Sequence, residues 1–454
     1  MTAVERTSQP DPEPIAKLLK GYIEGAEVQP ILDLIEPMHP ADIAEVMERL
    51  NRFEQNFLFD TLDAEIGSQV LVELEDATRE DVLEDIDEKR IPPLVDELES
   101  DDAADLVGEL DEDVRERVLR QVPRTSRVEV EQLLTYAEDT AGGIMALEIP
   151  WVKHSHSVEK AIDAVRQHHR DMEEIHEIFV VDEDHTLVGD ISPLKLLLSN
   201  PETPIAEIMD TDTISVHPEA DQEEAAVLAA KYDLIALPVV NQQNKLLGVI
   251  TYDDIFDVIE EEEQEDISYM AGTGEDEPAE RSALKAVRER GPWLLLGLAG
   301  GVGSAFVLSL FEGTLRENLA LAFFLPAIMA MAGSVAIQAS SLVVRGLATG
   351  SFAFHGIPRV LLRELRVSLL LGIGLGLILS LFMFLFEHNT HLSLCIMASL
   401  VLVVVNAAIS GTLIPLVLKR FGIDPAVAMG PFITTLNDIM GIAIYLLVVG
   451  ILRF

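Results

Sequence analysis

Residues 431–447 read PFITTLNDIMGIAIYLL, an apolar stretch with a single acidic side chain, Asp438, inside it. Together with the apolar residues up to Leu452, it is long enough to cross a bilayer, which takes about 20 mostly apolar residues in a helix. A carboxylate at that depth is costly unless it faces a polar path. No Lys or Arg lies deep in another apolar run to pair with it. The stretch therefore predicts a membrane-spanning helix with a functional aspartate.

Four more apolar runs precede this one. Five runs of this length, separated by short loops, leave no polar face for water, which excludes buried helices of a soluble protein. The five predicted spans are residues 293–311, 319–344, 367–386, 392–418 and 426–452.

Basic residues gather at one side of the predicted spans. They precede the first span or fall between the second and third or the fourth and fifth: Lys285, Arg288, Arg290, Arg345, Arg359, Arg363, Arg366, Lys419 and Arg420. Only Arg316 and Arg453 fall on the other side. Because basic loops stay in the cytoplasm, we expect a multi-pass protein of the cell (inner) membrane with its N-terminus inside and its C-terminus outside. The first residues lack a secretory signal pattern, so the internal spans are expected to direct insertion.

Charge divides the chain into two parts. The 454 residues carry a net charge of −46, yet the mean hydropathy is +0.26. Residues 291–454 contain six acidic and eight basic side chains, so the first 290 residues hold the acidic excess. That surface excludes nucleic acid as a partner. The one cysteine, Cys395, cannot form an intrachain disulfide.

Polar side chains within the spans are predicted to line an ion path. Carboxylate, hydroxyl and amide oxygens, without a thiolate or imidazole cluster, suit Mg²⁺ or Ca²⁺ better than zinc or copper. The predicted pore residues are Asp438, Asn437, Thr435, Asn406, Ser334 and Gln338.

Residues 145–260 contain an internal repeat. EIFVVDEDHTLVGDISPLK and ALPVVNQQNKLLGVITYDD superpose without a gap, so that Gly189 matches Gly248 and Ser192 matches Thr251. Each unit is predicted as helix, strand, tight turn, strand and helix. The pattern resembles a tandem pair of cystathionine-β-synthase (CBS) domains, which often bind adenine nucleotides. That resemblance implies a nucleotide site, for ATP or a related molecule, at Thr251 and Asp254; a purely structural pair is the alternative.

Residues 1–140 predict short amphipathic helices with acidic first turns, as in SDDAADLVGEL, and a further acidic run follows the repeat at residues 260–266. Most such acids are solvated faces that suit helix dipoles, but this density repels itself unless cations neutralise it.

The whole chain resembles the MgtE family of magnesium channels, with local agreement in YAEDTAGGIM (136–145), GIDPA (422–426) and GPFITTLND (430–438). The resemblance implies an all-α N domain (1–137), an α+β tandem CBS pair (138–203 and 204–260), an acidic connecting helix and linker (254–290) and an α-helical transmembrane pore domain of five spans (291–454). It also implies a homodimer in membrane lipid, with the residue matching Asp438 in the Mg²⁺ pathway.

The same resemblance implies regulatory Mg²⁺ sites that close the pore when cytosolic Mg²⁺ is high. The matching residues are Asp101, Asp105, Asp221, Glu223, Asp233, Asp254, Asp257, Glu262, Glu265, Asp266 and Asp424. Three positions depart from the family pattern: Ser334 replaces an asparagine, Gln69 replaces a regulatory glutamate, and Lys195 stands where a ribose-binding acid is expected.

Two rival functions stay open from the sequence. One is transport of another divalent cation, such as Co²⁺ or Mn²⁺, or exchange of Mg²⁺ for a counter-ion, on the same fold. The other is a non-conducting, membrane-anchored nucleotide sensor, for which Asp438 would be expendable. An enzyme is not expected, because His154 and His156 have no third ligand at metal-site spacing and the glycines at 297–303 lie in a span.

Overall fold

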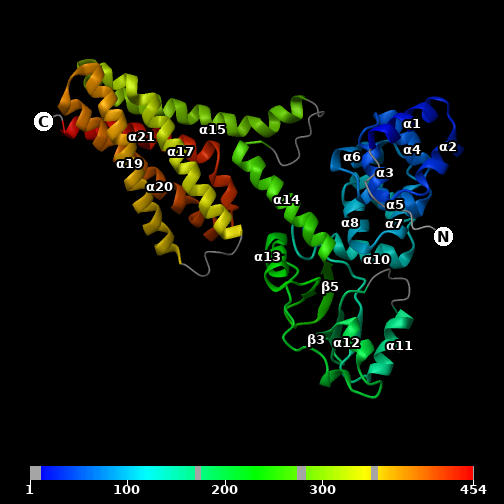
Figure 1. Cartoon of the computed structure of the whole chain (residues 1–454). Coiled ribbons are helices and arrows are strands. Elements are labelled where there is room, and N and C mark those ends of the chain that lie inside the picture. Colours follow the sequence, from blue (N-terminus) through cyan, green and yellow to red (C-terminus); the bar gives the residue numbers. More distant parts are fainter. Residues whose placement is uncertain (1–11, 169–174, 274–282, 349–355, 453–454) are drawn as a thin grey trace, which may run out of the picture. The chain divides into compact units, whose positions relative to one another are not determined.

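The computed structural model describes residues 12–168, 175–273, 283–348 and 356–452 (Figure 1). The chain forms two compact units, Met1–Val258 and Ile259–Phe454. The division falls inside α14 (Tyr252–Ala271), which begins in the first unit and ends in the second.

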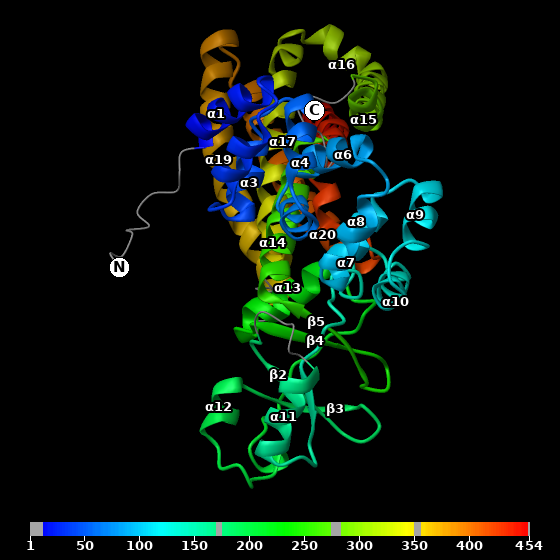
Figure 2. The same ribbon diagram turned by 90° about the vertical axis from the view of Figure 1, so that its right-hand side faces the viewer.

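Short helices build the first part of the first unit, as the acidic amphipathic pattern predicted (Figures 1 and 2). Side chains cap several of them: Asn51 and Glu54 form a reciprocal capping box, and Asp63 accepts a hydrogen bond from the amide of Ile66. Leu58 and Phe59 are fully buried between the helices. The elements are α1 (Pro12–Glu24), α2 (Val28–Ile35), α3 (Pro40–Met47), α4 (Arg52–Thr61), α5 (Ala64–Val72), α6 (Asp76–Asp85), α7 (Ile91–Glu97), α8 (Ser100–Gly108), α9 (Glu112–Leu119) and α10 (Arg124–Leu133).

The predicted repeat folds as two matching α/β units. The first contains β1 (Trp151–Lys153), α11 (Val158–His168), β2 (Ile178–Val181), β3 (Leu187–Ile191) and α12 (Pro193–Leu198); the second contains α13 (Gln222–Tyr232), β4 (Ala236–Val240), β5 (Leu246–Thr251) and α14, and a 3₁₀ turn, η1 (Ile205–Glu207), lies between them. Strands β2 and β3 pair antiparallel, as do β4 and β5, and β1 pairs parallel with β2. The two hairpin turns meet in a bridge between Thr186 and Lys245, which are equivalent positions of the repeat.

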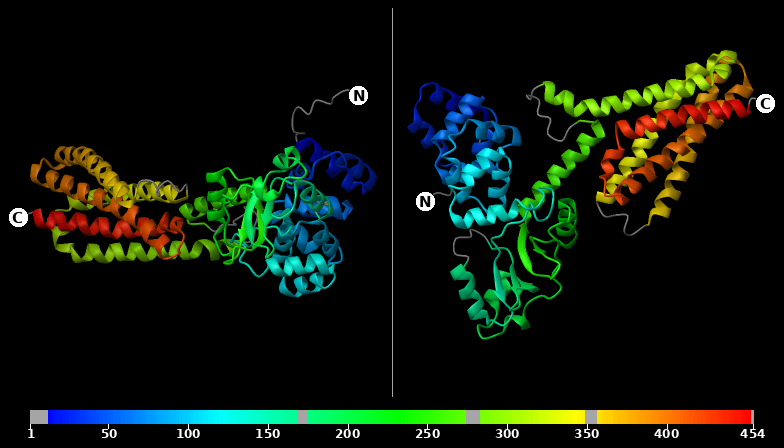
Figure 3. Two further views of the ribbon diagram at one scale, coloured as in Figure 1. Left: turned by 90° about the horizontal axis from the view of Figure 1, so that it is seen from below. Right: turned by 180° about the vertical axis from the view of Figure 1, so that it is seen from behind.

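The second unit is a helical bundle (Figure 3). Five of its helices are long and apolar enough to cross a membrane: 286–310, 320–347, 357–387, 390–420 and 431–452. They belong to α15 (Ala283–Leu310), α17 (Ala320–Ala348), α19 (Ile357–Glu387), α20 (Thr390–Arg420) and α21 (Pro431–Leu452), with the short α16 (Glu312–Glu317) and a 3₁₀ turn, η2 (Pro425–Ala428), in the connections. The five predicted spans are thus present as helices.

The span limits differ from the prediction at three places. Helix α15 begins ten residues before 293, and α19 begins ten residues before 367, because their first turns are charged and carry no apolar signal. The predicted last span, 426–452, is broken: η2 ends at Ala428 and α21 starts at Pro431. Gly430, with φ +66°, makes the break.

Glycines let the spanning helices pack closely. A β carbon on Gly411 of α20 would come within 2.4 Å of the carbonyl oxygen of Ala336 on α17. Gly372 of α19 lies in the same way against Val401 of α20. Small residues at such crossings favour helix association in lipid.

Candidate functional site

Asp438 lies on α21, seven residues after its first residue, or about 10 Å along the helix axis. Its side chain is half-buried, and among the described residues it has no hydrogen-bond or ion-pair partner. A carboxylate in this position is free to receive a cation or its water shell.

Asn437, the preceding residue, has a different environment. Its side chain is fully buried. The amide nitrogen donates to the carbonyl oxygen of Ile433 at 2.9 Å, and the amide oxygen accepts from the hydroxyl of Ser410 on α20 at 2.9 Å. Asn437 therefore joins α20 to α21, and its polar atoms are already engaged in a single chain.

Thr435 also packs against another helix. A β carbon on Gly300 of α15 would come within 1.9 Å of its methyl carbon, so the two helices touch at this point. Thr435 lies three residues before Asp438 and so shares its side of α21. The threonine thereby fixes the distance between α15 and the helix that carries the aspartate.

The other predicted pore residues lie towards the outside of the single chain. Ser334 and Gln338 are exposed on α17 and, four residues apart, share one face of that helix. Asn406 on α20 is half-buried, without a hydrogen-bond partner among the described residues. An exposed polar face on a membrane helix needs water or another protein surface next to it.

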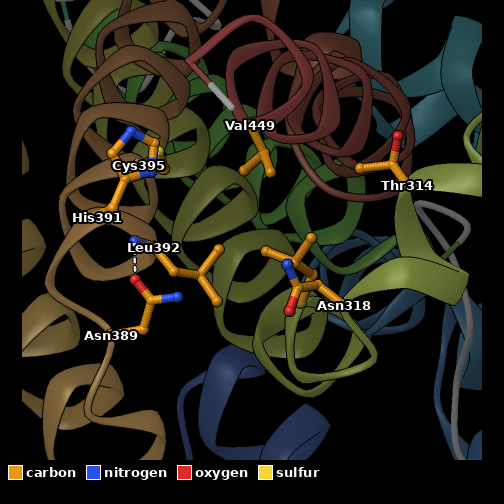
Figure 4. A pocket seen from close by; sticks show the side chains of 8 residues that line it. Thr314, Asn318, Asn389, His391, Leu392, Cys395 and Val449 are labelled. Atoms are coloured by element: carbon orange, nitrogen blue, oxygen red, sulfur yellow. Dashed lines mark hydrogen bonds between the residues drawn. The ribbon is translucent and has the colours of Figure 1, made fainter. Parts of the chain in front are cut away.

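A separate cavity of about 170 Å³ lies at another part of the membrane unit (Figure 4). The sulfur of Cys395 lies 3.7 Å from Nδ1 of His391, and Asn389 caps α20 by accepting from the amide of Leu392 at 3.1 Å. The cavity contains none of the predicted pore residues; its lining is Thr314, Asn318, Leu321, Asn389, His391, Leu392, Cys395 and Val449.

In the first unit, carboxylates of α8 face those at the start of α14. Burial and the charges of Asp254 and Asp102 raise the pKa of Asp101 well above its ordinary value. Burial and Asp254 raise the pKa of Asp102 to about 7, and burial raises that of Asp254 to about 7 against the opposing effect of Thr251. The contact is therefore electrostatically unfavourable when all three groups are ionised.

Asp105 lies one turn further along α8. Its pKa is raised to about 7 by desolvation and by the charges of Asp102 and Glu138. Among the described residues no three His, Cys, Asp or Glu side chains are close enough to hold one metal ion directly. The cluster instead suits a hydrated Mg²⁺, which keeps several waters and needs only one or two carboxylates.

Asp102 was not among the predicted site residues, and neither was the contact that orients α8. The hydroxyl of Ser100 donates to Glu148 at 2.7 Å and accepts from the amide of Leu147 at 2.8 Å. This contact ties the start of α8 to the segment that enters the repeat. The sequence signal for Asp102 was its place beside Asp101 in SDDAADLVGEL, because adjacent acids at the start of a helix can both lie near another helix.

The predicted nucleotide pair is linked internally. The hydroxyl and the amide of Thr251 donate to the carboxylate of Asp254 at 2.8 and 3.0 Å, which caps the start of α14. Asp254 thus lies at the acidic cluster and at the predicted nucleotide position at once.

The acids of α13 occupy opposite ends of that helix. Asp221 is its N-cap and accepts from the amide of Glu223, whereas Asp233 is its C-cap, with φ +53°. The two caps are about 18 Å apart along the axis, so they cannot hold one ion within one chain.

Within the second unit, the end of α14 packs on α17 and η2, and Gly272, directly after α14, lies against Pro431, the first residue of α21. Tyr269 contacts an apolar cluster of Val344, Ala426 and Met429. Glu262, Glu265 and Asp266, all half-exposed, lie on the same face of α14 as Tyr269; Asp424 is exposed and caps η2 through the amide of Ala426.

Family models match about three quarters of the chain. The model for MgtE, a divalent cation transporter, matches residues 325–448; that for the MgtE intracellular N domain matches 38–139; and that for the CBS domain matches 141–198 and 205–261. The magnesium transporter MgtE of Bacillus subtilis (strain 168) is 36% identical over 316 residues, 70% of each chain. That of Thermus thermophilus is 36% identical over 334 residues, 73% of each chain.

The chain belongs to the MgtE family of magnesium transporters. It is also similar to two solved structures of parts of such proteins. The soluble part of a magnesium transporter is 28% identical, with a TM-score of 0.50, over 56% of this chain and 99% of that one. The cytosolic domain of the Mg²⁺ channel MgtE in complex with ATP is 31% identical, with a TM-score of 0.51, over 54% of this chain and 99% of that one.

The predicted fold class is confirmed: an all-α N domain, an α+β tandem CBS pair and an α-helical transmembrane domain of five spans. Family membership also confirms a multi-pass membrane transporter rather than an enzyme. The three departures from the MgtE pattern are surface features of the single chain: Ser334 and Gln69 are exposed on α17 and α5, and Lys195 follows the N-cap of α12.

Proposed function

We propose that this MgtE-family chain conducts Mg²⁺ through a path that includes Asp438, and that Mg²⁺ binding to its acidic first unit closes that path. The observation that carries the proposal is the course of α14. The first turns of this helix bear Asp254, whose charge acts on the acids of α8, and the carbonyl oxygen of Met270 in its last turn lies against Gly430, directly before the helix that bears Asp438. One helix therefore carries residues of the acidic cluster at its start and residues that lie against the helix of Asp438 at its end.

The electrostatics support a gate of this kind. Without a cation, ionised Asp101, Asp102 and Asp254 repel one another, and the contact between α8 and α14 is weakened. Mg²⁺ neutralises the cluster and stabilises the state in which the two helices meet. Several such sites, including the acids along α14, make closure of the path depend more steeply on the Mg²⁺ concentration than one site would.

Three finer features belong to the same proposal. The chain works as a homodimer, in which the exposed polar face of α17 with Ser334 and Gln338 meets water or the second chain. The acidic unit lies in the cytoplasm and the C-terminus outside. An adenine nucleotide binds near Thr251 and Asp254, as the ATP complex of the related cytosolic domain suggests.

Mg²⁺ flux into proteoliposomes tests the gate. Flux should fall as Mg²⁺ on the side of the first unit rises, and the triple variant Asp101→Asn, Asp102→Asn, Asp254→Asn should need a higher concentration for the same block. A matched variant, Glu24→Gln, Glu65→Gln, Glu112→Gln, removes three exposed acids elsewhere in the unit and should respond like the wild type. If both variants are blocked at the same Mg²⁺ concentration, the acidic cluster does not control the gate. Flux of Co²⁺ or Mn²⁺ above that of Mg²⁺ would favour the rival transporter.

A further inference from the structure

Helix α19 carries a stripe of exposed residues whose character changes along its length. The spacing of four and three residues places them on one side of the helix: Arg359, Arg363, Arg366, Leu370, Ile373 and Leu377. The arginines occupy the first turns and the aliphatic residues follow. Leu370 is 72% exposed and Leu377 is 56% exposed.

The opposite side of α19 is the one that packs. Val360, Gly372 and Gly376 are buried there, and a β carbon on Gly376 would meet Met397 of α20 at 3.0 Å. The stripe therefore points away from the bundle. In a helix long and apolar enough to cross a membrane, its aliphatic part faces hydrocarbon.

The three guanidinium groups have no ion-pair or hydrogen-bond partner among the described residues. Glu364, the one acid in the first three turns of α19, is half-buried and lies off the stripe. Arginines at this depth are stabilised where a counter-charge from the lipid headgroup region is present.

Two further basic side chains lie at the same end of the hairpin that α19 and α20 form. Helices α19 and α20 run antiparallel, with Gly372 opposite Val401 and Gly376 opposite Met397. Continuing this register places Lys419 and Arg420, the last residues of α20, about one helical turn beyond the first residue of α19, at the same end of the two helices. Both are exposed and, among the described residues, unpaired.

We propose that this end of the α19–α20 hairpin binds the phosphate headgroup of an anionic phospholipid, whose acyl chains lie along Leu370, Ile373 and Leu377. Arg366 and Leu377 are about 16 Å apart along the axis, close to the thickness of one leaflet of a hydrocarbon core about 30 Å thick. The stripe thus matches a lipid in charge and in length. This inference rests on the membrane-spanning helices and not on the proposed ion path.

A second copy of the chain fits the stripe less well than a lipid. Two identical chains in one membrane are related by an axis normal to the bilayer, so their α19 helices would run parallel. Each arginine would then face its own equivalent across the interface. Like charges at that distance repel in a low dielectric, whereas a phosphate neutralises them.

The test is lipid binding to the full chain in detergent, with phosphatidylglycerol or phosphatidylcholine titrated in and bound lipid counted by native mass spectrometry. The wild type should bind phosphatidylglycerol more tightly than phosphatidylcholine. The variant Arg359→Gln, Arg363→Gln, Arg366→Gln should lose about fivefold in phosphatidylglycerol affinity per arginine. Its phosphatidylcholine binding should stay the same.

A control variant, Arg117→Gln, Arg120→Gln, Arg124→Gln, removes the same charge from α9 and α10 and should bind lipid like the wild type. Equal phosphatidylglycerol binding in the wild type and the α19 variant would overturn the proposal. So would full competition by inorganic phosphate, which indicates a plain anion site. A change of oligomeric state in the α19 variant would overturn it as well, in favour of a contact between copies.

Discussion

Gly430 lies directly against the end of α14: a β carbon added to it would come within 2.7 Å of the carbonyl oxygen of Met270. Gly430 has φ +66° and is followed by Pro431, which begins α21. Pro431 in turn lies against Gly272, where an added β carbon would come within 2.8 Å of the proline ring. The acidic connecting helix and the helix of Asp438 therefore meet backbone to backbone, so that a shift of one moves the other.

The first prediction concerns this contact. Gly430→Ala should strain the backbone by about 1–2 kcal/mol, because a β carbon disfavours positive φ, and should also push α14 away. Block of Mg²⁺ flux by Mg²⁺ on the side of the first unit should then need a higher concentration. Gly422→Ala is the control, since Gly422 has φ +71° but open space around it. Both variants should lose thermal stability, Gly430→Ala at least as much as Gly422→Ala, because only Gly430 has a backbone atom within 2.7 Å of the added β carbon. An unchanged Mg²⁺ response in Gly430→Ala would show that the contact does not transmit the signal.

The second prediction is a pH dependence of the first unit in the absence of divalent cations. The pKa values of Asp102 and Asp254 are raised to about 7, above those of the unfolded chain, because burial and like charges favour the protonated form. The folded state therefore binds more protons than the unfolded state between about pH 4 and pH 7. The contribution of these two carboxyl groups to thermal stability should be largest below about pH 4. It should be lost as the pH rises through about 7.

Thermal unfolding of the full chain with a chelator, followed at several pH values, measures this effect. Asp102→Asn with Asp254→Asn should flatten the profile, because neither amide titrates. Added Mg²⁺ should stabilise the wild type more at about pH 8 than at about pH 5, since only ionised carboxylates bind it. A wild-type profile that rises with pH over this range contradicts the assignment of the cluster.

The third prediction separates two roles for Asn437. If its main part is the bond to Ser410, then Asn437→Ala and Ser410→Ala should each destabilise the membrane unit by about 0.5–2 kcal/mol, and the double variant should cost less than the sum. Thermal unfolding in detergent measures both. The cation selectivity of the folded fraction should not change. Altered selectivity with full stability would instead support Asn437 as a pore ligand.

Much of the architecture could be predicted from the sequence, because each element carries its own local signal. The repeat predicted the paired hairpins, and its offset of 59 residues even relates His185 and Asn244, the positive-φ residues of the two turns. The acidic first turns predicted the short helices. The apolar runs predicted five spans, although not the charged turns of α15 and α19 that extend them.

The candidate site was less predictable, because it depends on which way each side chain points. The residues before Asp438, Thr-Thr-Leu-Asn, do not reveal from the sequence that Asn437 is buried against Ser410 while Thr435 packs on Gly300. Asp102 escaped notice for the same reason, since only the packing of α8 shows that both of the adjacent acids are desolvated. The break at Gly430 needs a contact 160 residues away to explain it.

Mg²⁺ uptake by proteoliposomes containing Asp438→Asn tests the central claim most directly. The substitution keeps the size of the side chain and removes its charge, so the protein should fold, with a thermal stability close to that of the wild type. Thr434→Ser, which keeps the hydroxyl that donates to the carbonyl oxygen of Gly430 at 2.8 Å, serves as a control on the same helix. We expect uptake to be lost in Asp438→Asn and kept in the control. Wild-type uptake by a folded Asp438→Asn protein would contradict an ion path through this carboxylate.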